Sequence, residues 1–356
     1  MQTPDIVSDD QWAYVLTLLP GDLEESARRS ALRRCRNVPS AAALMRMTFA
    51  YAVSDLSMKD VAAWAHAIGL AEITGPGLFY RLREAEGWLA EMLAKTLAEE
   101  LDAAPAGLCI RVVDATAISG PGAEGTEWRA HAMIDADRGR LCAVELSDDR
   151  VGEGYGLHPL REGEVVLGDR GYSTARGIEA VVNAGAYPVV RVNPHAIRLC
   201  DMQRKRFDLA ACEARLTVTE IMELDVLVPV PPDSYSTNSG KKKWALSSAK
   251  AWIPARIAGA RTRTDTVVWV LTTLSRERID SHNLLQLYRV RWQIELAFKR
   301  LKSLLHFDSL PSRQGPTAKS WMLARLLAAA VAEKLLDPNG SLSPWGYDIQ
   351  KARLHA

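Results

Sequence analysis

The sequence predicts an α/β protein in which helices come first, a mixed sheet follows, and a strand-rich insertion interrupts that sheet. The first hundred residues are rich in Ala, Leu, Arg and Glu and lack strand patterning. Short apolar runs typical of strands begin near Leu108. Between Asp169 and Glu295 lie 125 residues, more than one strand and one helix require, so we expect an insertion there. The expected segments are a helical N-terminal region (1–103), a core in two parts (104–194 and 267–312), the insertion (195–266) and a C-terminal helical region (313–356).

In the N-terminal region, residues 40–52 and 57–68 are predicted to form amphipathic helices. Ser57 and Asp60 have the spacing of a helix start signal, and Gly69 marks a stop. A second helix, over residues 73–83, carries Arg81 and Arg83. Two helices joined by a turn are typical of a helix-turn-helix that reads DNA, but packing within a helical bundle explains them equally well.

The core is predicted to begin with three antiparallel strands, followed by parallel strands that a helix connects. The expected strands are 108–113, 127–134, 140–146, 164–168 and 187–192. A turn over 135–139 joins the second and third strands, and a helix over 173–184 has Ser173 as its expected N-cap. The run 266–274 is expected to return the chain to the core, and 317–336 to form a last apolar helix.

Two acids directly follow predicted strands. Asp114 comes after the run Cys109-Ile-Arg-Val-Val, and Asp169 follows Glu164-Val-Val-Leu-Gly. Strand ends hold side chains rigidly and expose them, so acids there are candidates for function. A single acid in such a place is more often a turn or a helix cap, and only the combination makes an active site the better hypothesis.

A third acid lies in the segment 288–302, which is predicted to be helical from about Ser281. At about 100° per residue, Tyr288, Arg291 and Lys302 fall on the same helix face as Glu295. A lone carboxylate between two cations and a phenol suits a metal-binding acid beside a phosphate backbone. A solvated face with an Arg–Glu pair is the alternative.

With these motifs the chain resembles the DDE transposases of bacterial insertion sequences, specifically insertion-sequence family four, which carries a Y-(2)-R-(3)-E-(6)-K signature. Tyr288, Arg291, Glu295 and Lys302 match that spacing without a gap. Asp114 and the Asp-Arg-Gly-Tyr motif at 169–172 match the first two acidic motifs in order. The resemblance extends from about residue 108 to 305, and the first hundred residues match only in general character.

The resemblance implies a catalytic core of the RNase H-like type, which the predicted strand order also favours. Asp114, Asp169 and Glu295 are then the catalytic residues and the metal ligands. Three carboxylates without His or Cys neighbours favour Mg²⁺, with Mn²⁺ possible, over zinc. Two such ions can promote phosphodiester cleavage and transfer. The resemblance further implies cut-and-paste transposition through a hairpin at the element end.

Several other residues are expected to contact DNA. Tyr288, Arg291 and Lys302 should bind phosphates near the scissile bond. Trp269 lies where relatives carry a tryptophan that receives an extruded base, although a tryptophan packed in a strand is an equal alternative. Arg170, beside the second acid, contacts DNA or forms a structural ion pair.

The charge distribution supports a polyanionic partner, although the net charge is only +1. Residues 241–263 contain seven cations and no acid, and residues 286–325 contain eight cations and two acids. Solvated loops and helix faces can also produce such runs. We expect the partners to be the terminal inverted repeats of an element and target DNA. Coordinated cutting of two ends further predicts a homodimer on DNA.

The remaining composition predicts a cytoplasmic protein. Five cysteines are widely spaced and form no Cys-x-x-Cys pair, so we expect free, mostly buried thiols (Cys35, Cys109, Cys142, Cys200, Cys212). Early acids exclude a signal peptide, and the longest apolar tract, 326–332, is too short to span a membrane.

Two other functions stay open at this point. An RNase H-fold nuclease or recombinase would cut DNA without strand transfer. A DNA-binding protein descended from a transposase would have lost catalysis, although such a protein has no need of three aligned carboxylates.

Overall fold

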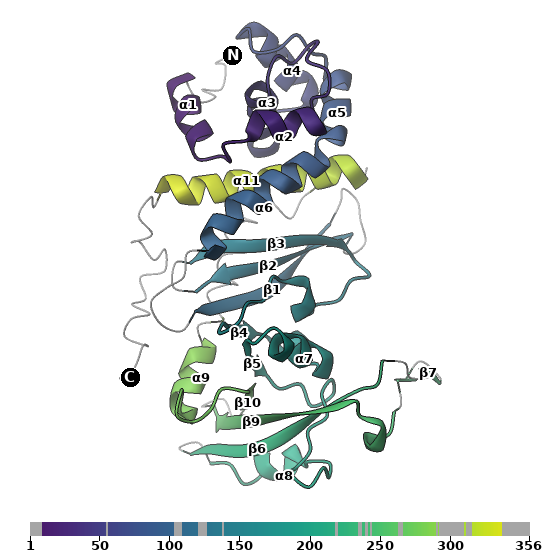
Figure 1. Ribbon diagram of the computed structural model, residues 1–356, viewed down its shortest axis with the longest axis vertical. Coiled ribbons are helices and arrows are strands. Elements are labelled where there is room, and N and C mark those ends of the chain that lie inside the picture. The colour runs from purple at the N-terminus through teal and green to yellow at the C-terminus, as the bar shows by residue number, and fades with distance from the viewer. Residues whose placement is uncertain are drawn as a thin grey trace.

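The computed structural model places most of the chain in one long, layered molecule (Figure 1). It describes residues 9–54, 56–102, 109–119, 127–136, 139–217, 220–233, 237–238, 241–242, 244–262, 266–289, 291, 310 and 315–336.

An eight-stranded mixed sheet forms the middle and lower part of the molecule, with the strand order β3-β2-β1-β4-β5-β10-β9-β6 (Figure 1). Strands β1, β4 and β5 run parallel, and the remaining neighbours are antiparallel. The expected α/β class is confirmed. The strands are β1 (Ile110–Ile118), β2 (Trp128–Asp135), β3 (Arg140–Asp148), β4 (Val165–Gly168), β5 (Tyr187–Arg191), β6 (Ile221–Val230), β9 (Ala251–Arg261) and β10 (Val267–Thr272).

Strand β1 is longer than the sequence predicted. We expected it to end at residue 113, but it continues to Ile118, so Asp114 lies in the middle of the strand and not at its end. The physical reason is pairing with β2, because Asp114 faces Ala132 and the ladder extends to Ile118 opposite Trp128. The neighbouring hairpin turn is as expected, with Gly139 at φ 66° donating its N–H to the Asp135 carbonyl.

The predicted insertion contains strands, as expected, and its two long strands extend the main sheet. Strand β10 pairs with β5 on one side and with β9 on the other. Strand β6 then pairs along the length of β9. The insertion also holds the short elements α8 (Leu209–Glu213), β7 (Thr237–Asn238), β8 (Lys241–Lys242) and the 3-10 helix η3 (Leu246–Ser248).

Helices occupy the N-terminal part, and their starts follow local capping rules. Ser40 caps α3, and Ser57 with Asp60 forms a complete capping box on α4. Thr74 caps α5, whose buried residues Leu78 and Leu82 face inward. These helices are α1 (Asp9–Thr17), α2 (Leu23–Arg29), α3 (Ala41–Val53), α4 (Met58–Ala67), α5 (Gly75–Glu84) and α6 (Glu86–Asp102).

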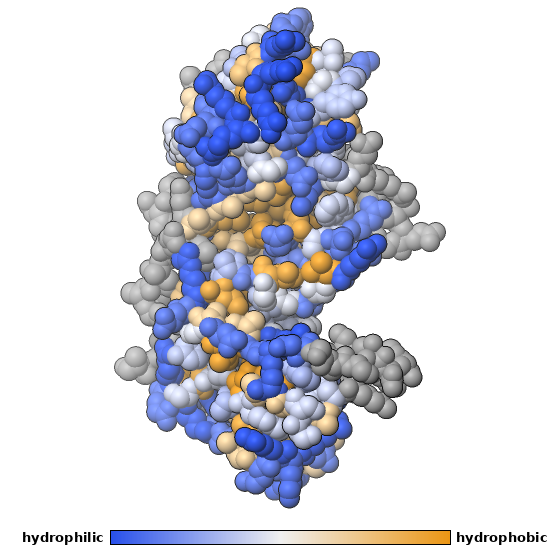
Figure 2. Space-filling model, turned by 45° about the vertical axis from the view of Figure 1, so that its right-hand side comes forward, coloured by the Kyte–Doolittle hydropathy of each residue, from blue (hydrophilic) through white to orange (hydrophobic). Residues whose placement is uncertain are grey.

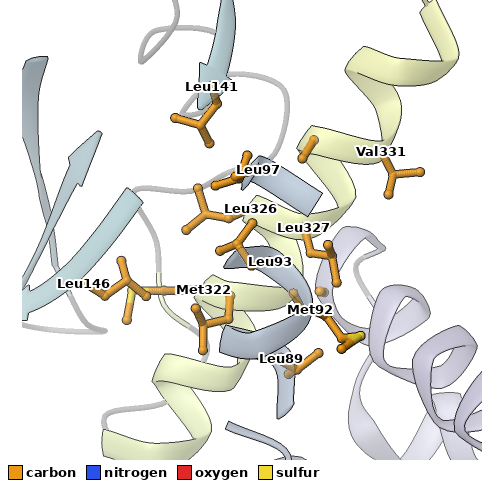
Figure 3. Packing of buried hydrophobic residues seen from close by; sticks show 14 of the residues in the cluster. Leu89, Met92, Leu93, Leu97, Leu141, Leu146, Met322, Leu326, Leu327 and Val331 are labelled. Carbon is orange, nitrogen blue, oxygen red and sulfur yellow. The ribbon is translucent and has the colours of Figure 1, made fainter. Parts of the chain in front are cut away.

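Helices α6 and α11 (Gly315–Leu336), which are distant in sequence, lie between α1 to α5 and the sheet (Figure 1). The expected C-terminal helix is α11, which crosses α6 beneath the N-terminal helices (Figure 1). Figure 3 shows Leu93 of α6 and Leu326 of α11 between Leu141 and Leu146 of β3 on one side and the N-terminal helices on the other. One hydrophobic core therefore joins the N-terminal helices, α11 and the sheet.

A second core covers the opposite face of the sheet under α7 (Ala175–Asn183) and the 3-10 helix η1 (Tyr155–Leu157). The expected helix begins later than predicted, because the chain first forms a 3-10 turn, η2 (Arg170–Tyr172). Thr174, and not Ser173, is the N-cap of α7, while the Ser173 hydroxyl accepts a hydrogen bond from the Asn193 N–H.

Burial of the cysteines is less extensive than expected. None of the five cysteines forms a disulfide, and only Cys142 and Cys200 are buried. Cys35 is exposed because it lies in the polar loop between α2 and α3, and not in an apolar run.

Hydrophilic residues gather at both ends of the molecule, and apolar residues cross the middle of the face shown in Figure 2. None of the helices in the described part of the chain is long and apolar enough to cross a membrane.

Candidate active site

Asp114 and Asp169 lie side by side on neighbouring parallel strands. The ladder pairs Val112 of β1 with Leu167 of β4; Asp114 lies two residues further along β1, and Asp169 two residues further along the chain, directly after β4. Neighbouring strands are about 4.8 Å apart, so this register brings the two carboxylates to adjacent positions. Asp114 Oδ1 accepts a hydrogen bond from the Ala115 N–H at 2.8 Å, and Asp169 Oδ1 accepts one from the Gly171 N–H at 2.7 Å.

The environment of Asp114 is that of a partly desolvated acid. Burial raises the pKa of Asp114 to about 6; the Ala115 N–H and Arg291 oppose that rise, and the negative charges of Asp169 and Glu153 add to it. Mutual repulsion between close carboxylates is relieved when a cation binds between them, so the arrangement favours a positive ligand.

A cation follows on the next strand. Val190 of β5 pairs with Gly168 of β4, so Arg191 takes the position beside Asp169. Asp114, Asp169 and Arg191 therefore form one row across β1, β4 and β5. We did not identify Arg191 from the sequence, although it directly follows a short apolar run just as the two acids do.

A further carboxylate, Glu153, approaches from the loop after β3. Its Oε2 lies only 2.1 Å from the point that a Cβ of residue 171 would occupy, and Asp169 Oδ1 lies 3.1 Å from that point. Gly171 therefore has to be glycine for Glu153 to come this close. Partial burial raises the pKa of Glu153, and the charge of Asp169 raises it further. The sequence carries no motif that would have indicated Glu153.

Two buried tyrosines lie behind the acids. Tyr155 and Tyr172 have ring centroids 5.0 Å apart and are fully enclosed, and neither hydroxyl has a hydrogen-bond partner within the described residues. Burial raises the pKa of both phenols, and the charges of nearby acids add to the effect, including Asp169 in each case. The phenols are therefore neutral and form an uncharged floor under the carboxylates.

Helix α9 (Ser281–Arg289) brings the first half of the signature to this site. Leu284 and Leu287 are buried and fix the helix against the sheet. Burial raises the pKa of Tyr288, and the Arg291 guanidinium lies 5.9 Å from the Tyr288 ring centroid. Arg291 also acts electrostatically on Asp114, as noted above, so these two signature residues and the two acids belong to one site.

The second half of the signature cannot be placed in the same way. Glu295 and Lys302 lie outside the described residues, and the predicted continuation of the helix through them stays a prediction. Helix α9 itself ends at Arg289, and the Arg291 N–H bonds to the Tyr288 carbonyl at 3.2 Å.

A basic groove of about 430 Å³ lies along α9, and its lining includes Arg191, the neighbour of Asp169 in the row described above. Its cationic walls come from β5, β9 and the end of α9, and its floor is apolar. The lining includes Arg191, Arg261, Arg289, Arg291, His282, Tyr288, Val268 and Leu285. The size and charge of this groove fit part of a phosphate backbone next to the carboxylates.

The other two predicted DNA contacts, Arg170 and Trp269, do not line this groove. Arg170 is exposed beside Asp169, and within the described chain no acid forms an ion pair with it. Trp269 is only 3% exposed, in β10, and its indole Nε1–H donates to Glu213 Oε1 at 3.1 Å. Trp269 is therefore packed within its strand, as in the alternative to a base-receiving role.

The donor set near the acids fits a hard divalent cation. Asp114, Asp169 and Glu153 offer only carboxylate oxygens, the ligands that Mg²⁺ and Mn²⁺ prefer. In the part of the chain that the structure describes, no three His, Cys, Asp or Glu side chains converge closely enough to hold a metal ion by themselves. The two aspartates can supply part of a coordination sphere, and the third predicted ligand, Glu295, is outside that part.

Comparison with known proteins identifies transposases by both family and sequence similarity. A family model described as "Transposase DDE domain" matches residues 105–331. The transposase of insertion sequence element IS421 from Escherichia coli is 32% identical over 359 residues, covering 95% of this chain and 97% of that protein. The InsL protein of insertion sequence element IS186A from Escherichia coli K12 is 32% identical over 358 residues, with the same coverage.

Among solved structures, a piggyBac transposase synaptic complex with hairpin DNA aligns with 98% of this chain and 76% of its own. The sequence identity is 8% and the TM-score is 0.44, a level at which the alignment does not establish a common fold.

Proposed function

The chain belongs to the DDE transposase family of insertion sequences, and we propose that it cuts DNA at the ends of such an element and joins those ends to target DNA. The proposed catalytic residues are Asp114, Asp169 and Glu295. The observation that carries the assignment is the register of β1 and β4, which makes the first two of these acids neighbours.

The acids are proposed to hold divalent cations, Mg²⁺ or Mn²⁺, in a two-ion arrangement. When bound, such ions activate an attacking oxygen and neutralise the departing one in phosphodiester chemistry. Asp114 and Asp169 are held for this role by backbone N–H donors and by their strands, so the protein maintains their separation before any ion arrives. The neutral phenols beneath them add no charge that would compete with a bound cation.

Cations of this chain are proposed to hold the DNA next to the acids. Arg291 and Arg191 flank the aspartates, and an arginine can bind a phosphate with two parallel hydrogen bonds. Tyr288 and Lys302 are proposed to contact phosphates of the same strand, and exposed Arg170 to contact the strand beyond Asp169. The groove along α9 supports this path for the backbone.

We assign an RNase H-like core to the segments 104–194 and 267–312, with 195–266 as an insertion. The order β3-β2-β1-β4-β5, with β1 to β3 antiparallel and β4 and β5 parallel to β1, supports that assignment. The helical region 1–103 is proposed as a DNA-binding domain, and 313–356 as a C-terminal helical region.

Cleavage is proposed to proceed through a hairpin at the element end, as the sequence resemblance implies. Trp269 is enclosed by β9 and bonded to Glu213, so in this conformation its ring is not available to an extruded base. Another aromatic or apolar surface would then receive the base.

Cleavage of a labelled element end in Mg²⁺ tests the proposal. Asp114→Asn and Asp169→Asn should each lower the cleavage rate by at least about 100-fold, because each removes a negative charge that is proposed to hold the catalytic cations. Glu145→Gln, an exposed acid of β3, is the matched control and should cleave normally. Full activity in the Asp169→Asn protein would overturn the assignment of the acids.

Two product analyses separate the finer claims. A hairpin product on a denaturing gel is expected for the hairpin route, and its absence alongside ordinary cleavage would exclude that route only. Joining to a target plasmid distinguishes a transposase from a nuclease. The mass of the protein–DNA complex should correspond to two protein chains, because two element ends have to be cut together.

A further inference from the structure

An arginine-rich loop on the N-terminal helices has no role in the site described above. The loop connects α2 to α3 and presents Arg33, Arg34 and Arg36, all exposed. Within the described part of the chain, none of these three guanidinium groups forms an ion pair or a side-chain hydrogen bond. Three unpaired cations on four successive residues repel one another, so the loop is suited to a ligand that carries several negative charges.

Another arginine fixes this loop in place. Arg81 of α5 donates from Nη2 to the Arg34 carbonyl at 2.7 Å and from Nη1 to the Ala31 carbonyl at 3.5 Å. Helix α5 is in turn anchored by its buried Leu78 and Leu82. Arg81 was a candidate DNA contact by sequence, but its guanidinium is directed toward the protein backbone, where it sets the shape of the loop.

Between the loop and α5 lies a hollow of about 630 Å³. Arg33 and Arg34 line one side, and Tyr80 of α5 lines the other with 57% of its surface exposed. Arg83 extends over the Tyr80 ring, 5.7 Å from the ring centroid. Among the described residues, the only acid lining the hollow is Glu84, whose carboxylate lies 3.8 Å from Arg81.

We propose that Arg33, Arg34 and Arg36 form a clamp for the phosphate backbone of duplex DNA, with Tyr80 and Arg83 of α5 at its edge and Arg81 as the positioning residue. The inference rests on the proposed function, because it takes DNA as the partner. It changes the expected mode of binding: the loop after α2, and not the predicted helix-turn-helix of α4 and α5, makes the main phosphate contacts.

The contrast with Arg29 supports a phosphate ligand. Arg29 belongs to the same basic stretch of sequence, but its guanidinium is paired with Asp22, Glu25 and Glu91. The fold thus neutralises Arg29 and leaves the three arginines of the loop without acids. Arginine is also the side chain best matched to phosphate, because its planar fork binds two oxygens at once.

Binding of a labelled duplex, measured by fluorescence anisotropy over a series of salt concentrations, tests the clamp. The double variant Arg33→Gln/Arg34→Gln should bind at least about tenfold more weakly at low salt. A plot of log affinity against log salt concentration has a negative slope. The magnitude of that slope should fall by about 0.9 for each phosphate that the variant no longer neutralises. The matched control Arg29→Gln/Arg276→Gln also removes two charges, but both arginines are ion-paired with acids, so affinity and slope should stay unchanged.

Arg81→Lys tests the positioning role separately. Lysine keeps the charge but cannot donate to two carbonyls in the same planar geometry, so DNA affinity should fall while the thermal unfolding temperature changes little. Equal affinity and slope in the loop variant and the wild type would overturn the clamp. If the wild-type protein bound no duplex at all, the proposed function would fail as well. Duplex affinity equal to wild type in the Asp169→Asn protein would confirm that binding and cleavage are separable.

Discussion

Trp269 shows how a single side chain can be committed to packing. It lies opposite Gly259 in the β9–β10 ladder, and a Cβ at residue 259 would come within 2.4 Å of the indole ring. The glycine therefore leaves the space that the ring fills, and the aromatic face covers the neighbouring strand. Glu213 fixes the ring orientation from α8.

Trp269→Ala should lower the free energy of unfolding by about 3–5 kcal/mol, because it removes a large buried ring and leaves a cavity. Urea denaturation provides the measurement. Trp252→Ala, at a half-buried position of β9, is the control and should cost clearly less. A loss below about 1 kcal/mol for Trp269→Ala would mean that the ring is free for another role.

His158 is a second residue whose environment determines its chemistry. Both ring nitrogens are buried without a partner among the described residues, and the ring lies 6.2 Å from that of Tyr172. Burial lowers the pKa of His158 from its ordinary 6.5 to about 3, and nearby His131 acts in the same direction. The imidazole is therefore neutral in the folded protein across the physiological range.

The lowered pKa predicts a loss of stability in acid. Between pH 6.5 and about 3 the unfolded chain binds a proton at His158 that the folded chain does not, so stability falls as pH falls through this window. The free energy of unfolding of His158→Phe should drop between pH 7 and pH 5 by about 2 kcal/mol less than that of the wild type. An identical pH profile for both proteins would contradict this, and His195→Phe, at an exposed histidine, serves as the control.

Among the elements, β1 carries two charged residues with opposite roles. Arg111, near its start, is only 1% exposed and pairs with Asp135 of β2 at 2.7 Å and with Glu164 before β4 at 3.0 Å. Asp114, three residues later, belongs to the candidate active site. The buried ion pairs bind β1 to both neighbouring strands, and this holds the register that aligns Asp114 with Asp169.

Asp135→Asn should destabilise the protein by about 3–5 kcal/mol, because it leaves a buried guanidinium without one of its counter-charges. Asp225→Asn is the matched control, since it removes an exposed acid paired with Arg276 and should cost at most about 1 kcal/mol. Equal losses for the two variants, measured by urea denaturation, would show that the buried network does not hold the strands.

At the scale of the whole molecule, α11 joins parts that are distant in sequence. It packs on α6, α3 and α5 on one side and on β3 on the other. The Ser320 hydroxyl donates to the Leu82 carbonyl of α5 at 2.6 Å, and Lys319 pairs with Glu86 at 3.2 Å. Helix α11 therefore couples the N-terminal helices to the sheet.

Leu327→Ala should cost about 2–5 kcal/mol, and the loss should extend beyond α11, because this buried leucine lies in the shared core (Figure 3). Hydrogen exchange should show faster exchange in α6 and β3 together. Leu335→Ala, near the exposed end of the same helix, should have little effect. Faster exchange confined to α11 would mean that the two halves are independent.

The sequence determined the local features of this protein. Caps at Ser40 and Ser57, the strand patterns from residue 110 onward and the position of α11 follow from interactions among residues a few positions apart, which a single sequence displays directly. It also identified Asp114 and Asp169 as candidates, because each stands at a break in an apolar pattern.

Tertiary structure decided which side chains meet. The places of Arg191 and Glu153 beside the acids, the burial of Trp269 and the turn of Arg81 toward the loop after α2 depend on strand register and packing between distant segments. A sequence pattern does not contain that information, because pairing between strands is chosen by the total free energy of the folded chain. The predicted place of Glu295 among the acids stays a prediction, because this residue lies outside the described part of the chain.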